Sequence, residues 1–260
     1  MHQQPAFLVT RPGAAGRLLA DDLQALGAEA LWLPSFELGP APDPAAVAAT
    51  LQRLAQFDLA IFVSPAAVRG AAAALPATWP EGTRAAVVGT ATASALRAHY
   101  AAAPPHVVEP QGDAAAGGSE ALWAALLTQR VVAAQAPRRV LILRATHGRE
   151  WLGERLSEAG AQVETLAVYT RTPCSAPPAA LERLKRWRGA GRAIVAVITS
   201  SEAVSVLGQQ LAPDAGLRAA VLAGLALASH ERVAAAARSA GFARVAVAAP
   251  GTDTLLAAVR

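Results

Sequence analysis

Short, fully apolar runs of four or five residues recur along the chain, and a helix-length segment follows most of them. The clearest runs are residues 59–63 (LAIFV), 85–88 (AAVV), 140–143 (VLIL) and 194–198 (IVAVI). Polar and apolar positions do not alternate within these runs, which is typical of strands buried on both faces of a sheet. Strands that alternate with helices favour parallel sheets with helices on both sides.

The same order of strand, turn and helix continues through the rest of the chain. We expect further strands at residues 7–9, 30–33, 107–108, 225–228 and 244–247, and helices at residues 14–26, 45–56, 93–99, 119–129, 149–159, 178–187, 202–211, 232–240 and from about 252. Another helix begins at Ser64-Pro65, because Ser is a good N-cap and Pro fits the first helical position. Ser119 is a second candidate cap. Residues 111–118 are expected to form a loop of small residues.

One strand-like stretch, residues 163–173 (VETLAVYTRTP), lies where a linker would be expected. It separates residues 59–68 from residues 195–204, two segments that share the order of apolar strand, hydroxyl-rich turn and helix. Gly and Pro residues between positions 39 and 44 mark an earlier boundary. The chain therefore crosses twice between two folded regions, and both crossings are extended enough to pair with each other.

This organisation predicts an α/β fold with two domains, each a parallel sheet flanked by helices, joined by a two-stranded β-ladder. The first domain is discontinuous and takes residues 1–35 and 173–260, the second takes residues 39–166, and residues 34–38 and 167–172 are the connectors. Tyr169, one of only 2 tyrosines in the chain, lies in the second connector and is expected to face the cleft between the domains.

Composition narrows the classes of function. Over half of the 260 residues are hydrophobic, yet the apolar runs are far shorter than the roughly 20 residues that span a bilayer. The first residues lack a basic region followed by a long apolar core, so no signal peptide is expected. Cys174 is the single cysteine, which excludes an internal disulfide and a cysteine-based zinc site. A cytoplasmic protein without membrane association is the default expectation.

The net charge of +4 is carried almost wholly by arginine, and Lys185 is the only lysine. The one dense basic run, residues 183–188 (RLKRWR), is best interpreted as the solvated face of a helix. Nucleic-acid binding is disfavoured because no basic patch is interleaved with stacking aromatic residues. A mildly cationic surface does suit an anionic small molecule.

Hydroxyl side chains gather where ligands bind in open parallel sheets, in the turns between strand ends and helix N-termini. They are Thr10, Ser64, Thr90, Thr92, Thr146, Thr199, Ser200, Ser201 and Ser229. Beside free helix N–H groups they form a series of weak anion sites, each helped by the helix dipole. Plain N-capping accounts for any single one of them, but a whole series that faces one cleft favours binding of an anion.

Other kinds of site find little support. No GxxxxGK[ST] phosphate loop is present, and VVGTATA (residues 87–93) lacks the three-glycine spacing of a dinucleotide site. The five histidines, His2 among them, are dispersed without the spacing of metal ligands. Cys174 has no histidine near it in sequence, so covalent catalysis is not expected. Paired acidic residues for acid–base chemistry are not evident in the turns.

Several segments, in their order and spacing, resemble the uroporphyrinogen-III synthase family along nearly the whole chain. They are Val9-Thr10-Arg11-Pro12, Leu33-Pro34, Phe62-Val63-Ser64-Pro65-Ala66-Ala67-Val68, Val88-Gly89-Thr90-Ala91-Thr92-Ala93, Val140-Leu141-Ile142-Leu143-Arg144, Gly148-Arg149, Val168-Tyr169 and Ile198-Thr199-Ser200-Ser201. The resemblance implies a cofactor-free enzyme with two α/β domains. It would cyclise the linear tetrapyrrole hydroxymethylbilane to uroporphyrinogen III in haem biosynthesis, with loss of water and inversion of ring D.

The resemblance also implies roles for individual residues. Tyr169 is expected to assist departure of the hydroxyl group, as a proton donor or as a hydrogen-bond partner. The expected substrate-binding residues are Thr10, Arg11, Ser64, Arg69, Thr90, Thr92, Thr199, Ser200, Ser201 and Ser229. Arg69 or Arg11 would meet substrate carboxylates, whereas surface ion pairs are an equally good interpretation of Arg144 and Arg149. No metal is implied, a monomer is expected, and a transient contact with the preceding pathway enzyme stays open.

The chain departs from the family pattern in the last third. An IGxTT-type turn is replaced by residues 226–232 (ALASHER), which offer Ser229, His230 or Arg232 in place of the expected threonine, and Arg144 is followed by Ala145 instead of glycine. The alternative function is a two-domain binding or sensor protein that closes on an anionic small molecule without chemistry. The two functions differ at Tyr169, because a binding protein has no need of a hydroxyl there.

Overall fold

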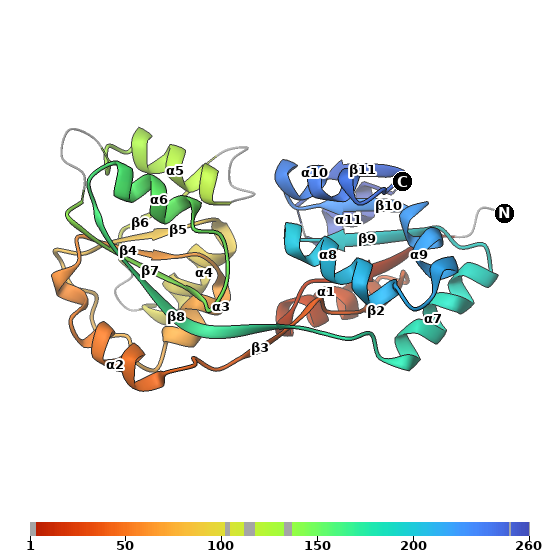
Figure 1. Ribbon diagram of the computed structural model, residues 1–260, viewed down its shortest axis with the longest axis horizontal. Coiled ribbons are helices and arrows are strands. Elements are labelled where there is room, and N and C mark those ends of the chain that lie inside the picture. The colour runs from red at the N-terminus through yellow and green to blue at the C-terminus, as the bar shows by residue number, and fades with distance from the viewer. Residues whose placement is uncertain (1–3, 102–104, 112–117, 133–136, 250, 260) are drawn as a thin grey trace. The chain divides into compact units, whose positions relative to one another are not determined.

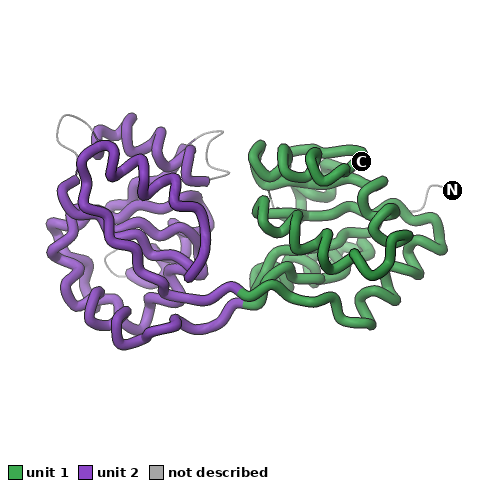
Figure 2. Tube along the Cα trace, in the orientation of Figure 1, with its two compact units in different colours: residues 1–37, 172–260 green, residues 38–171 purple. Residues whose placement is uncertain are grey.

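A computed structural model describes residues 4–101, 105–111, 118–132, 137–249 and 251–259. The chain forms two compact units (Figures 1 and 2). Unit 1 comprises Met1–Glu37 and Thr172–Arg260, and unit 2 comprises Leu38–Arg171. His2 and most of the predicted loop at residues 111–118 lie outside the described residues.

Unit 1 is built on a five-stranded parallel sheet in the order β11-β10-β9-β1-β2. Its strands are β1 (Ala6–Val9), β2 (Glu29–Trp32), β9 (Ile194–Ile198), β10 (Leu225–Ala228) and β11 (Arg244–Val247). Its helices are α1 (Gly13–Ala25), α7 (Pro178–Gly189), α8 (Ser201–Leu211), α9 (Ala215–Leu222), α10 (Glu231–Ser239) and α11 (Thr252–Ala257). Helices α1 and α11 pack on one face of the sheet and the other four on the opposite face.

Unit 2 is built on a six-stranded sheet in the order β3-β8-β7-β4-β5-β6. Its strands are β3 (Phe36–Gly39), β4 (Leu59–Phe62), β5 (Arg84–Val87), β6 (Val107–Val108), β7 (Arg139–Ala145) and β8 (Gln162–Pro173). Its helices are α2 (Pro44–Gln52), the short 3-10 helix η1 (Leu54–Gln56), α3 (Pro65–Ala71), α4 (Thr90–His99), α5 (Ser119–Thr128) and α6 (Trp151–Glu158). Helices α2, α3 and α4 cover one face, and α5 and α6 cover the other.

The central strands of both sheets explain the continuous apolar runs in the sequence. In β4, Ala60 and Phe62 join the core on one face, while Leu59 and Ile61 join the core on the other. All four are fully buried, so no position of this strand meets water. The predicted α/β fold with helices on both sides of parallel sheets is therefore confirmed.

Strands β3 and β8 carry the chain across the boundary between the units and lie side by side (Figure 1). Gly39 lies against Thr170, and the Cys174 N–H donates to the carbonyl of Ser35 at 3.0 Å. Residue numbers rise along one strand as they fall along the other, so this pair runs antiparallel. The expected two-stranded ladder is present.

Gln210 of α8 holds the two chain segments together where they enter unit 1. Its side-chain Nε2 donates to the carbonyl of Pro34 at 2.9 Å and to the carbonyl of Cys174 at 3.0 Å. The side chain is only 4% exposed. Because buried carbonyl groups need donors, this amide satisfies both segments at one point and fixes their separation.

Two local expectations fail. Ser119 is the first residue of α5 and not its cap, a position that Gly118 occupies. Helix α9 was not predicted, because its sequence AGLRAAVL is short, contains Gly216 and lacks a clear apolar period. By contrast, Ser64 caps α3 as expected, since its Oγ accepts from the Ala67 N–H at 3.0 Å.

None of the helices in the described part of the chain combines the length and the apolar character that a membrane crossing needs.

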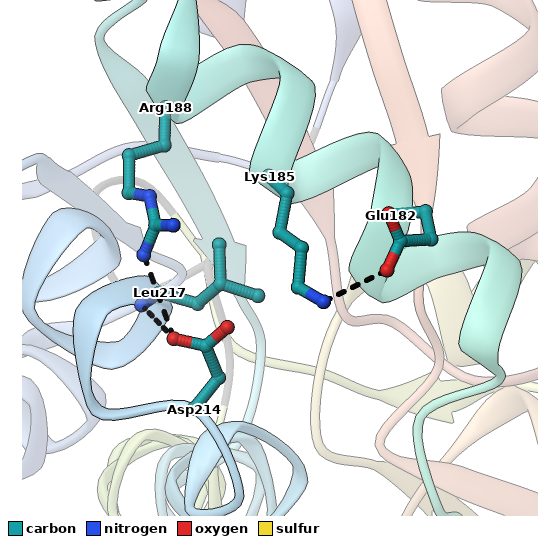
Figure 3. Close-up of polar contacts among 5 residues, drawn as sticks. All are labelled: Glu182, Lys185, Arg188, Asp214 and Leu217. Atoms are coloured by element: carbon teal, nitrogen blue, oxygen red, sulfur yellow. Dashed lines mark hydrogen bonds and ion pairs between the residues drawn. The ribbon is translucent and has the colours of Figure 1, made fainter.

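Asp214 is the N-cap of α9, the helix that the sequence pattern did not predict. Its Oδ1 accepts from the Leu217 N–H at 2.9 Å and lies 3.5 Å from Nη1 of Arg188 (Figure 3). The Leu217 hydrogen bond, followed by the nearby charges of Arg188 and Lys185, lowers the pKa of this carboxyl below its usual value. On the facing helix α7, Lys185 also donates to Glu182 at 2.8 Å.

We predict that Asp214→Asn flattens the acid limb of the stability curve. A carboxyl whose pKa is lowered by folding stabilises the protein above its unfolded pKa, near 3.8, and this contribution disappears as the pH falls through the lowered folded value. Asn keeps an oxygen that caps α9 but carries no charge. Urea unfolding of both proteins across the acid range measures the difference.

The matched control is Asp22→Asn, because Asp22 is exposed on α1 and its carboxylate has no ion pair among the described residues. Asp22→Asn should leave the curve unchanged. Parallel curves for wild type and Asp214→Asn down to the lowest pH would contradict the prediction.

Candidate active site

A β-bulge turns Tyr169 toward the face of the unit 2 sheet that packs on α3. Along β7 and β8 the register pairs Arg144 with Ala167, but Ala145 with Tyr169, so Val168 is an extra residue. Without the bulge, Val168 and Tyr169 would point to opposite faces. Instead both belong to the same core cluster as Leu166. The bulge therefore places the Tyr169 phenol on the face opposite to the one that strict alternation along the strand predicts.

The phenol of Tyr169 meets the hydroxyl of Ser64. Tyr169 Oη lies 3.1 Å from Ser64 Oγ, although 105 residues separate the two in sequence. Tyr169 is 8% exposed, and Ser64 is half-buried at the N-terminus of α3. Since Ser64 Oγ accepts from the Ala67 N–H, its own proton is free to point at Tyr169 Oη.

A pocket of about 590 Å³ lies beside this pair, entirely within unit 2. Its lining residues come from β3 and the loop after it, from α2, from α3 and its C-terminal end, and from β8. The walls are mostly apolar and include Leu38, Pro40, Val47 and Tyr169. Apolar pockets of this volume with a few convergent polar groups are typical ligand sites.

Arg69 supplies the positive charge of this pocket. It lies in the last turn of α3, is exposed, and lines the cavity. Its guanidinium has no ion pair and no side-chain hydrogen bond with any other residue of the described part of the chain. An unpaired guanidinium beside an apolar wall suits a ring that carries a carboxylate.

The other predicted residues of unit 2 differ in accessibility. Thr90 is exposed at the first position of α4, whereas Thr92, in the same turn, is buried. Arg144 is buried and pairs with Glu150 at 2.8 Å, and Arg149 pairs with Glu120 at 2.6 Å. Both arginines therefore form ion pairs, but only that of Arg149 lies at the surface as expected, because Arg144 is buried.

Several hydroxyls of unit 1 are used by the fold itself. Thr10 is fully buried and donates to the carbonyl of Val197 at 2.8 Å, and Ser229 Oγ donates to the carbonyl of Thr199 at 3.4 Å. Ser200 caps α8 by accepting from the Ala203 N–H at 3.2 Å. The carbonyl of Arg11 accepts from the Trp32 ring N–H at 2.9 Å.

Ser201, the first residue of α8, differs from these hydroxyls. Its Oγ is buried and has no hydrogen-bond partner among the described residues. This hydroxyl is enclosed within the fold, whereas Thr199, just before α8, is half-buried. Thr10, by contrast, is explained by packing within the sheet.

The described residues contain no group of three or more His, Cys, Asp or Glu side chains placed to hold a metal ion.

Comparison with known proteins decides the family. The family model described as "Uroporphyrinogen-III synthase HemD" matches residues 18–257. The chain is 32% identical over 200 residues to the uroporphyrinogen-III synthase of Salmonella typhimurium, with 76% of each chain covered. It is 31% identical over 205 residues to that of Escherichia coli, with 78% of each covered. The chain belongs to the uroporphyrinogen-III synthase family.

Solved structures of this family share the fold. A mutant uroporphyrinogen III synthase from Thermus thermophilus superposes with a TM-score of 0.59 at 22% identity, over 94% of this chain and 92% of that one. The Helicobacter pylori uroporphyrinogen-III synthetase gives a TM-score of 0.56 at 14% identity, over 99% and 100% of the two chains. At such identities the likeness concerns the fold alone.

The sequence of this member of the uroporphyrinogen-III synthase family identifies Ser64 and Tyr169 as candidate site residues. It indicates neither the contact between them nor the pocket. The bulge that brings the two together leaves no local sequence signal. Gly39 and Gly70, which both line the pocket, were also missed. A glycine inside a helical segment, as at position 70, is the one signal that marks a close approach.

We predict that Ser64→Ala destabilises the protein by about 0.5–2 kcal/mol, the usual cost of a lost N-cap. It should also shift the ring signals of Tyr169 in a nuclear magnetic resonance spectrum of tyrosine-labelled protein, because the phenol loses its neighbour at 3.1 Å. Urea unfolding measures the first effect. With 2 tyrosines in the chain, Tyr100→Phe assigns the signals.

Ser200→Ala is the matched control, since Ser200 caps α8 with the same geometry but has no tyrosine beside it. It should lower stability similarly and leave the Tyr169 signals unchanged. Equal spectral shifts in both variants would refute the contact.

Proposed function

We propose that this chain closes the linear tetrapyrrole hydroxymethylbilane to uroporphyrinogen III, with loss of water and inversion of ring D. The observation that carries the proposal is the contact between the hydroxyls of Ser64 and Tyr169, because Tyr169 also lines a pocket whose lining includes Arg69. Membership of the uroporphyrinogen-III synthase family supplies the reaction. The pair offers a phenol that can donate a proton or a hydrogen bond to a departing hydroxyl.

The substrate suits the chemistry of the pocket. Pyrrole rings are flat and apolar, and in this tetrapyrrole they carry acetate and propionate side chains. An apolar wall suits a ring face, and the Arg69 guanidinium, which lines the same pocket, is the proposed partner of a carboxylate on that ring. Thr90, which is exposed at the start of α4 in the same unit, is a further proposed partner for a carboxylate.

The first chemical step breaks the bond between carbon and the departing hydroxyl. The electron pair of the adjacent pyrrole nitrogen expels the hydroxyl and leaves an azafulvenium cation, and the oxygen takes a proton to depart as water. When Ser64 donates its proton to Tyr169 Oη, the phenol O–H is free to donate to the leaving oxygen. Tyr169 then acts as a proton donor or hydrogen-bond partner of the leaving group.

The second step forms a carbon–carbon bond between the cation and the last ring. Attack at the substituted carbon of that ring leaves this carbon bonded to two methylene bridges. Its original bridge bond then breaks, which leaves a second azafulvenium cation on the neighbouring ring, and this cation bonds to the free carbon of the last ring to complete the inversion. Direct attack at the free carbon gives the isomer that forms spontaneously. The proton released when the rings regain aromaticity balances the one that left with water. The choice between the two carbons depends on how the rings are oriented. Correct orientation by the protein can lower the activation barrier by several kcal/mol.

The direct test is incubation of the purified protein with freshly made hydroxymethylbilane, followed by chromatographic separation of the oxidised products. Isomer III in large excess over isomer I is the expected result. Production of isomer I alone, at the rate seen without protein, would overturn the proposed function and leave the anion-binding alternative. The absence of a cofactor, a monomeric state and a cytoplasmic location remain predictions.

We predict that Tyr169→Phe lowers kcat by about 10²-fold, the lower end of what a positioned proton donor contributes. The share of isomer I should rise because spontaneous closure then competes. Phe keeps the ring in the core cluster, so thermal unfolding should change little. Unchanged turnover in a folded Tyr169→Phe protein would show that the phenol only lines the pocket.

We predict that Arg69→Gln raises KM about 5-fold with little change in kcat, because a carboxylate contact made in both ground state and transition state is lost. This corresponds to about 1 kcal/mol, a typical value for an exposed ion pair. Steady-state kinetics at low ionic strength measure the effect, which added salt should reduce.

Arg84→Gln is the matched control. Arg84 is also exposed and without an ion pair in the described part of the chain, but it begins β5 and does not line the pocket. Its substitution should leave KM unchanged. An equal rise of KM in both variants would mean that only overall charge matters.

A further inference from the structure

Two glycines touch the residues on either side of Tyr169. A Cβ atom at Gly70 of α3 would overlap the carbonyl oxygen of Val168, and it would lie 2.9 Å from that carbonyl carbon and 3.4 Å from Tyr169 Cβ. A Cβ atom at Gly39 of β3 would overlap Oγ1 of Thr170. Both glycines line the pocket. Helix α3 and strand β3 therefore approach β8 more closely than any side chain would permit.

The two glycines differ in the kind of group that an added side chain would meet. The group that a side chain at position 70 would meet is main chain, held by the pairing of β8 with β7 and by the bulge at Val168. The group that a side chain at position 39 would meet is a threonine hydroxyl, and the next nearest atom, Thr170 Cβ, is 3.8 Å away. Crowding at Gly70 must move backbone, whereas crowding at Gly39 meets a side-chain hydroxyl on β8 that the substitution Thr170→Ala would remove.

The contact at Gly70 also fixes the distance across which Ser64 and Tyr169 meet. Ser64 caps α3 and Gly70 lies near the other end of the same helix. The helix rests on the Val168 carbonyl at Gly70, and its cap reaches Tyr169 Oη at 3.1 Å. A side chain at position 70 would either push α3 away from β8 or displace residues 168 and 169. Either movement would change the distance between Ser64 Oγ and Tyr169 Oη.

We infer that Gly70, supported by Gly39, is a positioning residue that sets the orientation of the Tyr169 phenol. The inference rests on the proposed function for its catalytic consequence, but the geometric part stands without it. Gly70 touches neither substrate nor leaving group in this role and acts through the backbone of residues 168–169.

The geometric test uses Gly70→Ala in tyrosine-labelled protein. The Tyr169 ring signals should shift relative to wild type, with Tyr100→Phe again giving the assignment. Gly153→Ala is the matched control, because Gly153 is a helical glycine of the same unit whose added Cβ would meet only ordinary contacts, Ile142 at 3.7 Å and Val163 at 3.8 Å. Unmoved Tyr169 signals in folded Gly70→Ala would overturn the inference, whatever the activity.

The catalytic test compares kcat, KM and the ratio of isomers III to I. Gly70→Ala should lower kcat about 10-fold and raise the share of isomer I, since small misplacements of a positioned group are costly. In a Tyr169→Phe background the same change should cost less than about 2-fold, because effects of coupled residues are not additive. Independent, additive losses would overturn the claim that Gly70 acts through Tyr169.

A second route applies if Gly70→Ala does not fold, which circular dichroism shows. Gly39→Ala should shift the Tyr169 signals less, and adding Thr170→Ala should restore them, because the crowded hydroxyl is then gone. No shift, or a shift that Thr170→Ala does not reverse, would count against the inference. If the wild-type protein forms no isomer III, only the proposed function is refuted. The geometric inference is tested separately, since the spectral result does not depend on turnover.

Discussion

The contact between helix α3 and strand β8 is the constraint on which the candidate site depends. Only glycine permits the helix to rest on the Val168 carbonyl. That approach brings the capping hydroxyl of Ser64 within 3.1 Å of Tyr169. The bulge completes the arrangement, because it turns Tyr169 to the face that α3 covers. Backbone packing and register, more than any single polar side chain, therefore determine where the phenol lies.

Much of the fold follows from the sequence because both sheets are buried on two faces. The apolar runs around Ile61, Ile142 and Val197 leave no alternation, and this pattern predicts central parallel strands correctly. Helices with strong signals, such as α3 after Ser64-Pro65, begin where expected. Helix α9 has no comparable pattern; Asp214 caps its start and also pairs with Arg188 of α7, a contact that the local pattern does not indicate.

The site was predictable in residue type but not in geometry. Hydroxyls at the ends of parallel strands are visible in the sequence, yet the sequence does not say which of them the fold consumes. Thr10 and Ser200 bond to the protein's own backbone, whereas Ser201 Oγ has no partner among the described residues. The bulge at Val168 and the pocket beside it arise from long-range pairing, and local patterns carry no trace of such pairing.

Ser64 and Ser200 cap their helices in the same way but differ in the side chains that lie beside them. Both accept a helix N–H and begin helices after central strands, so their contributions to folding are alike. Only Ser64 has a phenol beside it, and its remaining proton can fix the direction of the Tyr169 hydroxyl. The same cap thus serves folding and orientation at once. The proposed reaction asks mainly for orientation, and a phenol whose direction is fixed in this way meets that requirement.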